Sequence, residues 1–269
     1  MSGPALSGGQ YCVTGLVFQL LVGLDRGLRV VIDRTAHEGP ALVAATMVLE
    51  PDLGGDHDIS TPAERLVEQV KIRTNGKAWT PGEIAGEVLP DLAKAVRDED
   101  HMPTRYRLMT DGALNCGALL DLSQRLRDRP LPEDPLLALD DDNRKAFFYG
   151  RWLSERAFFV ALMSRAGIGE PMRLWRLLAS FEAEGNCSES DLEARIDAVL
   201  AEVVDAREDV AGKRHELIGR MAGLAKQGSS VGAAALLEQA GLPAERLLHG
   251  ARLPRIMREG LRRDLEALG

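Results

Sequence analysis

Aromatic residues are scarce in this chain, and its cysteines are few and far apart. Phe, Trp and Tyr make up 4% of the 269 residues. The three cysteines, Cys12, Cys116 and Cys187, form no C-x-x-C pair, so neither a disulfide framework nor a zinc ribbon is expected. This cysteine usage fits a reducing compartment, and we expect a cytoplasmic location.

Positive charge is not in excess, and long hydrophobic runs are missing. The 33 Lys and Arg residues face 41 Asp and Glu residues, a net charge of −8, which argues against a protein that binds nucleic acid by bulk charge. The first ten residues, MSGPALSGGQ, have no basic segment before an apolar core. We therefore expect neither a signal peptide nor a membrane-spanning helix.

Several common catalytic motifs are also missing from the sequence. There is no G-x-G-x-x-G, and Gly76-Lys77 lacks the upstream glycine of a phosphate-binding loop. No H-E-x-x-H or G-x-S-x-G occurs, and the five histidines are scattered. Nucleotide binding, a zinc site and acyl-transfer chemistry therefore have no motif to support them.

Hydrophobic patterning predicts an α/β fold around a small mixed sheet. Thr80, Pro81 and Glu83 form a helix-start signature, with Pro at the first helical position and Glu three residues after the cap. The predicted helices cover 11–28, 80–97 and the segment through Leu119, Leu122 and Leu126, and the predicted strands cover 28–32, 42–49, 65–73 and 106–110. Residues 51–58 read as a turn.

The composition shifts to Pro and Asp over residues 127–142, which predicts a domain boundary near residue 135. Residues 1–135 form the predicted α/β core. Residues 136–269 are predicted to form an α-helical domain that ends in linker or docking helices. We expect the aromatic residues of this second half to build a helical core: Phe147, Phe148, Trp152, Phe158, Phe159, Trp175 and Phe181.

The polar residues with the most chemical content are Glu50, Asp58 and the pair Gln69 and Lys71. Side chains alternate along a strand, so Gln69 and Lys71 point to one face and Glu68 to the other. A carboxylate beside an oxygen acceptor and a lysine makes a site for a hard cation with a positive group next to it. Phosphodiester hydrolysis requires such a combination.

The run VLEPDLGGDHDI followed by ERLVEQVKIR resembles the acidic-then-Q-x-K pattern of the PD-(D/E)XK nuclease superfamily. Within it, the likeness is to the double-stranded-DNA endonuclease domain found at the N-terminus of bacterial anti-phage proteins. Further similarities are the opening helix with GLVFQLL, the helix after Trp79 and the strand YRLMTDG. The resemblance spans roughly residues 10–240 and implies a restriction-endonuclease-like core.

The resemblance also implies roles for individual residues. Asp58 would be the main metal ligand, Glu50 a second acidic ligand, and Gln69 would replace the usual acidic residue of the motif. Lys71 would be the catalytic lysine, and Gln19 a supporting polar residue on the first helix. The implied cofactor is Mg²⁺ or Mn²⁺.

Two alternatives stay open at this stage. The Asp56-His57-Asp58 cluster allows Asp56 to be the ligand in place of Asp58. Glu68 could serve as the acidic residue if a bulge reversed the faces of its strand.

The sequence thus supports three functional hypotheses. The first is a metal-dependent endodeoxyribonuclease that cuts double-stranded DNA as an anti-phage effector, acting as a homo-oligomer, with an NTPase or sensor module or another partner protein. The second is a catalytically inactive, nuclease-like scaffold or partner-binding subunit. The third is a helical signalling adaptor, which requires the strands at 42–49 and 66–72 to be absent.

Overall fold

The chain is mixed α/β in its computed structural model. The structure describes residues 8–38, 46–49, 54–73, 76–97, 102–142, 144–202, 204, 209–227, 230–232 and 235. The chain forms two compact units. Unit 1 contains residues 1–19, 50–58 and 63–188, and unit 2 contains residues 20–49, 59–62 and 189–269.

The sheet of unit 1 is built around two parallel pairings. Strand β4 (Thr104–Thr110) lies between β3 (Arg65–Lys71) and β7 (Phe181–Glu184), and it runs parallel to both. Strand β2 (His57–Ser60) is the neighbour of β3 on its other side. The first six residues of β3 are buried, as expected for a central strand that is covered on both faces.

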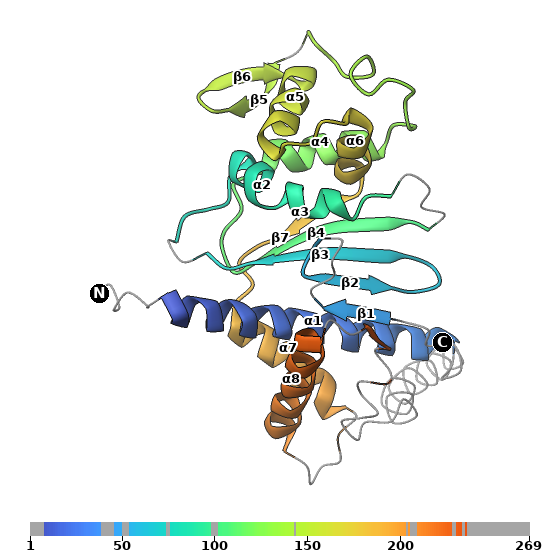
Figure 1. Cartoon of the computed structure of the whole chain (residues 1–269), viewed down its shortest axis with the longest axis vertical. Coiled ribbons are helices and arrows are strands. Elements are labelled where there is room, and N and C mark those ends of the chain that lie inside the picture. The colour runs from blue at the N-terminus through green and yellow to red at the C-terminus, as the bar shows by residue number, and fades with distance from the viewer. Residues whose placement is uncertain are drawn as a thin grey trace, which may run out of the picture. The chain divides into compact units, whose positions relative to one another are not determined.

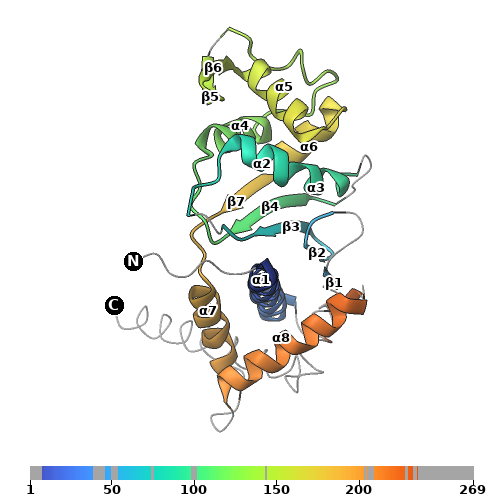
Figure 2. The same ribbon diagram turned by 60° about the vertical axis from the view of Figure 1, so that its left-hand side comes forward.

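Helices cover one face of these strands. In both views α2, α3, α4 and α6 lie on the same side of β3, β4 and β7 (Figures 1 and 2). The hairpin of β5 and β6 packs beside α5. The bounds are α2 (Pro81–Glu87), α3 (Leu89–Lys94), α4 (Gly117–Arg127), β5 (Arg144–Phe148), β6 (Arg151–Ser154), α5 (Glu155–Ala166) and α6 (Pro171–Ala179). Large side chains fill the space between the layers, among them Leu108, Leu119, Phe158, Trp175 and Phe181.

The predicted helix start at Thr80 is confirmed. The Thr80 side chain accepts from the Glu83 backbone N–H, and the Glu83 carboxylate accepts from the Thr80 backbone N–H at 2.9 Å, which completes a capping box. The predicted single helix to residue 97 is instead two helices that meet at Val88. Pro90 explains the break, because it has no N–H to continue the hydrogen bonding of α2.

Unit 2 combines one long helix, a strand pair and a helix pair. Its strands β1 (Thr46–Leu49) and β8 (Ser230–Gly232) run antiparallel, with Thr46 opposite Gly232. Its helices are α1 (Gly8–Glu38), whose first residues belong to unit 1, α7 (Glu189–Ala201) and α8 (Val210–Gln227). Helices α7 and α8 pack together (Figure 2). An ion pair of 2.6 Å between the buried Arg214 and the half-buried Asp197 joins them.

The structure corrects two predictions about secondary structure. The predicted strand at 28–32 lies within α1, because a short Leu- and Val-rich run fits a buried helix as well as a strand. The second half is not wholly helical, because β5, β6, β7 and β8 occur there. Residues 136–188 belong to unit 1 together with the β3–β4 sheet. The predicted linker and docking helices beyond residue 235 lie outside the described residues.

The helical-adaptor hypothesis is wrong, because β1 and β3 are present at 46–49 and 65–71. In the part of the chain that the structure describes, no helix combines the length and the apolar character needed to cross a membrane.

Glu155 ties three segments of unit 1 together at the start of α5. Its carboxylate is 2% exposed and lies 2.7 Å from Arg125 Nε and 2.8 Å from Arg129 Nη1. The backbone N–H of Asp140 donates to it as well, at 3.1 Å. Burial alone would raise the pKa of Glu155, but the hydrogen bonds from Arg125 and Arg129 outweigh it and hold the pKa below 4.5.

We expect Glu155→Gln to lower the free energy of unfolding by about 2 kcal/mol at pH 7, because charged hydrogen bonds are lost. A carboxylate with a lowered folded-state pKa stabilises the fold above its unfolded pKa and loses that effect as the pH falls. The difference between variant and wild type should therefore shrink below about pH 4.5. Urea unfolding followed by circular dichroism at pH 7 and pH 4 measures both effects. The exposed Glu133→Gln is the matched control, and equal midpoints for Glu155→Gln and wild type at pH 7 would contradict the assignment.

Candidate functional site

The segment Asp56-His57-Asp58 runs beside β3, and each of its side chains pairs with one polar residue of that strand. A turn with positive φ at Gly54 (96°) and Gly55 (81°) brings the segment there. A Cβ at Gly55 would lie 2.9 Å from Val67 Cγ1 and 3.2 Å from the Glu68 carbonyl oxygen. Glycine at position 55 thus allows both the left-handed backbone and the close approach to β3.

Asp56 is the acidic residue that meets Gln69. Its Oδ2 accepts hydrogen bonds from Gln69 Nε2 at 2.7 Å and from the Val70 backbone N–H at 2.5 Å. The Asp56 backbone N–H donates to the Glu68 carbonyl at 2.7 Å. Gln69 is 3% exposed, whereas Asp56 is half-buried. The structure therefore holds a carboxylate and an amide together at the edge of the buried part of β3.

Lys71 is the last residue of β3, and strand alternation places it on the same face as Gln69. Its side chain is half-buried, and among the described residues we find no hydrogen bond or ion pair for its Nζ atom. An ammonium group thus follows the Asp56–Gln69 pair along one strand face. Of the two aspartates that the sequence left open as the ligand, Asp56 is therefore the one that lies beside Gln69.

Asp58, predicted as the main metal ligand, instead forms an ion pair with Arg65. Arg65 Nη2 lies 2.6 Å from Asp58 Oδ2, and Arg65 Nε lies 3.1 Å from both carboxylate oxygens. Both side chains are largely buried: the exposed fraction is 4% for Arg65 and 13% for Asp58. Arg65 also donates to the Ala95 carbonyl at 3.0 Å. Sequence reasoning gave Arg65 no role, although a buried strand that begins with arginine needs an acidic partner.

Glu68 lies on the opposite face of β3 from Gln69. The β3–β4 register runs unbroken from Arg65 opposite Thr104 to Lys71 opposite Thr110, so this pairing contains no bulge that reverses the faces. Glu68 is fully buried and lies 3.2 Å from His57 Nδ1. The Nε2 atom of His57 is buried without a hydrogen-bond partner. The structure therefore assigns Glu68 to a buried pair with His57.

The remaining predicted residues are Gln19 and Glu50. Gln19 is half-buried on α1, one turn after Gly15. A Cβ at Gly15 would lie 3.6 Å from Cδ1 of Ile72, the residue that follows Lys71. This contact brings the beginning of α1 to the end of β3 where Lys71 lies. Glu50 lies outside the described residues.

The loops after β3 and β4 are fixed to each other next to Lys71. Arg73 forms a 2.6 Å ion pair with Glu83 and lies 4.0 Å from the centre of the Trp79 ring. The indole N–H of Trp79 donates to Thr110 Oγ1 at 3.0 Å, and the Arg73 backbone N–H donates to Asp111. The surface beside the candidate lysine is therefore rigidly built.

Comparisons with known proteins give no family for this chain. No protein-family model, curated protein or solved structure matches it. Within the described residues, no group of three or more His, Cys, Asp and Glu side chains is arranged to hold a metal ion. Among the described residues, those that would hold a metal at the β2–β3 site are Asp56 and Gln69, through its amide oxygen, with water completing the coordination.

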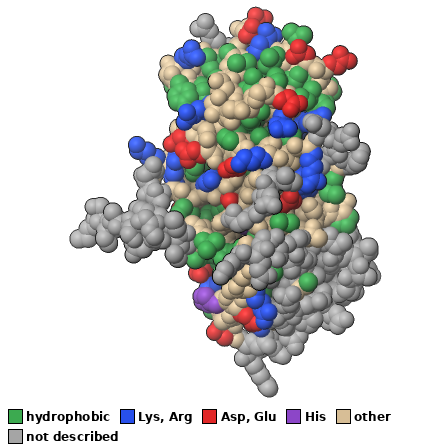
Figure 3. Space-filling model, viewed as in Figure 1, with side chains coloured by type: hydrophobic (Ala, Val, Ile, Leu, Met, Phe, Trp, Pro, Cys, Tyr) green, Lys and Arg blue, Asp and Glu red, His purple; other side chains and the backbone are tan. Residues whose placement is uncertain are grey.

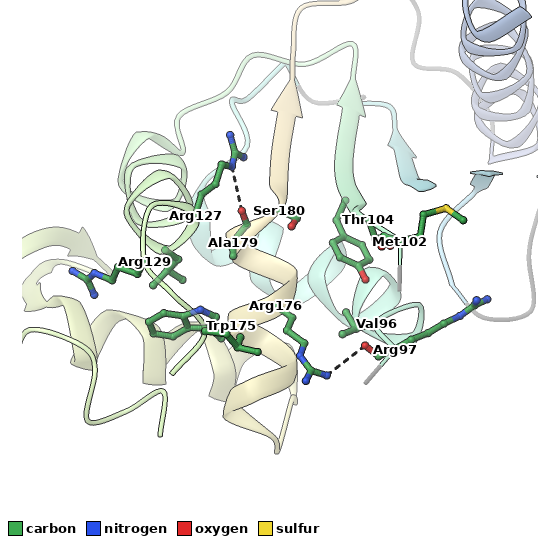
Figure 4. A pocket seen from close by; sticks show the side chains of 13 residues that line it. Val96, Arg97, Met102, Thr104, Arg127, Arg129, Trp175, Arg176, Ala179 and Ser180 are labelled. Carbon is green, nitrogen blue, oxygen red and sulfur yellow. Dashed lines mark hydrogen bonds between the residues drawn. The ribbon is translucent and has the colours of Figure 1, made fainter. Parts of the chain in front are cut away.

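A second concave region does not form an anion site. A pocket of about 420 Å³ lies at the start of β4 and β7 and is lined by four arginines. Figure 4 shows their side chains pointing in different directions. Arg127 donates to the carbonyls of Ala179 and Phe181, Arg129 pairs with Glu155, and Arg176 donates to the Arg97 carbonyl. These guanidinium groups serve the packing of the surrounding helices.

Cys116 is also unsuited to nucleophilic chemistry. Burial raises the pKa of its thiol to about 11, so it stays protonated at neutral pH.

The Asp58–Arg65 pair should behave as a structural ion pair. We expect Asp58→Ala to lower the free energy of unfolding by about 3 kcal/mol, because it leaves the buried Arg65 guanidinium without its carboxylate. Urea unfolding of Asp58→Ala, Arg65→Met and the double variant measures the coupling between the two residues. The double variant should be more stable than the sum of the single effects predicts. Strict additivity would contradict the assignment.

Proposed function

We propose that the chain is a metal-dependent nuclease that hydrolyses phosphodiester bonds of DNA at Asp56, Gln69 and Lys71. One observation carries the proposal: the Asp56 carboxylate is held 2.7 Å from the Gln69 amide, and Lys71 follows on the same face of β3. The confirmed elements α1, α2 and β4 occur in the order that the family resemblance implies, which supports the same proposal.

The donor set at this site suits a cation that keeps most of its water. Mg²⁺ is commonly held by one or two carboxylates, with water completing its octahedron, and Asp56 and Gln69 are the residues that would hold it. When bound, such an ion lowers the pKa of a coordinated water and stabilises phosphate charge. The Asp56 carboxylate is already oriented by the Gln69 amide and the Val70 N–H.

Lys71 supplies the positive charge of the site. Its ammonium can donate hydrogen bonds to a non-bridging phosphate oxygen and to the attacking water, and it stabilises the negative charge that develops during attack. Because Lys71 ends β3, its side chain starts from a fixed strand and leads toward solvent.

The more specific setting rests on the family resemblance alone. We propose double-stranded DNA as the substrate, an anti-phage effector as the role, and self-association as the means of cutting both strands. These proposals depend on the Q-x-K likeness.

A second candidate is a nuclease-like subunit that binds a partner without cleaving DNA. Two observations favour it: the Asp58 carboxylate is committed to Arg65, and the described residues contain no cluster of three metal-ligating side chains. Isothermal titration with Mn²⁺ separates the candidates, since the nuclease requires binding that Asp56→Asn weakens.

We expect supercoiled plasmid to be nicked or degraded with Mg²⁺ and to stay intact with EDTA. Asp56→Ala and Lys71→Ala should each lower the cleavage rate by about 100-fold or more, because each removes a group that acts on the transition state. Gel electrophoresis of timed reactions measures the rate, with circular dichroism to confirm folding.

Lys94→Ala is the matched control, because Lys94 is an exposed lysine paired with Asp91 on α3, and its loss should leave the rate unchanged. Asp58→Asn distinguishes the two aspartates. If Asp58→Asn abolishes cleavage in folded protein while Asp56→Asn does not, the assignment of Asp56 is wrong.

A further inference from the structure

The β5–β6 hairpin exposes an aromatic pair. Phe147 and Trp152 are directly opposite each other, with ring centroids 5.5 Å apart and an interplanar angle of 59°. Their side chains are 54% and 58% exposed, whereas Phe148 on the other face is buried against Phe158. The sequence-based expectation that Phe147 and Trp152 belong to the core is therefore wrong. The hairpin is anchored through the face that carries Phe148, and the face that carries Phe147 and Trp152 is exposed.

A third aromatic ring lies at the turn of the hairpin. Tyr149 has a φ of 46° and is 68% exposed. With Gly150 (φ 81°), Tyr149 forms the two-residue turn between Phe148 and Arg151, and such hairpin turns adopt positive φ at both residues. A Cβ at Gly82 would lie 2.6 Å from the Tyr149 hydroxyl, so glycine at position 82 leaves room for this ring. Among the described side chains, Phe147, Tyr149 and Trp152 are the exposed aromatic residues.

These rings border a pocket of about 590 Å³ with hydrogen-bonding groups. Its polar lining includes Thr80, Asn115 and Asp121. Thr80 follows Trp79, whose backbone exchanges hydrogen bonds of 2.8 Å with Ala113 and Asn115. The pocket is thus built on the loops that leave the carboxyl ends of β3 and β4. Since parallel strands end at the same edge, this is the edge at which Lys71 lies.

The charge of the hairpin contrasts with that of the whole chain. The segment RKAFFYGRWLS, from Arg144 to Ser154, contains three basic residues and no acidic one, although the net charge of the chain is −8. Hydrophobic, basic and acidic side chains are mixed over this end of unit 1 (Figure 3). The described basic side chain of the hairpin is Arg151, which is exposed next to Trp152 on β6. Exposed rings with a cation beside them suit a ligand that is both aromatic and anionic.

We propose that the β5–β6 hairpin and its pocket bind unpaired bases of single-stranded DNA, which stack on Phe147 and Trp152. A base is planar and carries donors and acceptors that Thr80, Asn115 and Asp121 can meet, and the exposed Arg151 of β6 can contact a backbone phosphate. A bilayer surface would contact the exposed rings but could not enter the polar pocket. The inference rests on the proposed nuclease for its biological setting and adds a second contact to the DNA substrate.

The test uses the full chain and a fluorescein-labelled oligothymidine of about 15 nucleotides in EDTA, so that no cleavage occurs. Fluorescence anisotropy gives the affinity. Phe147→Ala and Trp152→Ala should each weaken binding roughly five- to 150-fold, the range for loss of one stacked base. Trp152→Phe, which retains a ring, should recover most of the affinity. Leu137→Ala is the matched control, because Leu137 is 75% exposed and lies outside the hairpin.

Tryptophan fluorescence provides a second readout of stacking. Of the three tryptophans, Trp79 and Trp175 are buried and Trp152 is exposed. Titration with unlabelled oligothymidine should quench the emission of Trp152, and Trp152→Phe should remove the quenching while binding persists. Binding that is equally tight in wild type, Phe147→Ala and Trp152→Ala would overturn the proposal. So would a lack of binding to single-stranded DNA together with Trp152-dependent sedimentation on phosphatidylserine vesicles.

The two proposals fail separately. If Mg²⁺ supports cleavage that depends on Lys71 but the hairpin variants bind as wild type does, the nuclease stands and the hairpin proposal is lost. If oligothymidine binds through Trp152 but no nucleic acid is cleaved, the hairpin proposal stands and the nuclease is lost.

Discussion

Strand β3 carries polar side chains through the interior of unit 1, and each buried one requires a partner. Arg65, Glu68 and Gln69 are 3%, 0% and 3% exposed. Their partners are the three consecutive residues of the segment Asp56-His57-Asp58. The order of contacts is reversed, so that Asp56 meets Gln69 and Asp58 meets Arg65. This interlocking fixes the segment on β3 and determines which aspartate lies toward Lys71.

The pairing also explains how the two aspartates differ although they are two residues apart. Alternation puts both on the face of β3 that carries Arg65, Gln69 and Lys71, and His57 on the face of Glu68. Asp58 lies in an ion pair with Arg65, whereas Asp56 accepts hydrogen bonds from the Gln69 amide and the Val70 N–H. Asp58 therefore stabilises the fold through its ion pair, and Asp56 is the aspartate beside Gln69.

The parallel arrangement of β3 and β4 brings the candidate site at Lys71 and the aromatic pocket to one edge of the sheet. The strands end at Lys71 and Thr110, which are opposite each other. The loops that follow are joined through Trp79 and Asn115. The hairpin, with three exposed rings, borders the pocket built on these loops. Anchoring through Phe148 and Phe158 allows the hairpin to present its other face without loss of packing.

The sequence by itself determined features that depend on neighbours along the chain. These include the capping box at Thr80, the strands predicted at 65–73 and 106–110, which are β3 (65–71) and β4 (104–110), and the alternation that puts Gln69 and Lys71 on one face. Features that depend on distant partners required the tertiary structure. Residues 28–32 continue the helix α1, in which Leu28 is buried, and β7 is a strand because β4 offers an edge for it. Only the tertiary structure showed that Phe148 is buried whereas Phe147 is exposed. The contact of residues 56–58 with β3 likewise determined that Asp56, and not Asp58, lies beside Gln69. Local periodicity says nothing about which partner a polar side chain will meet.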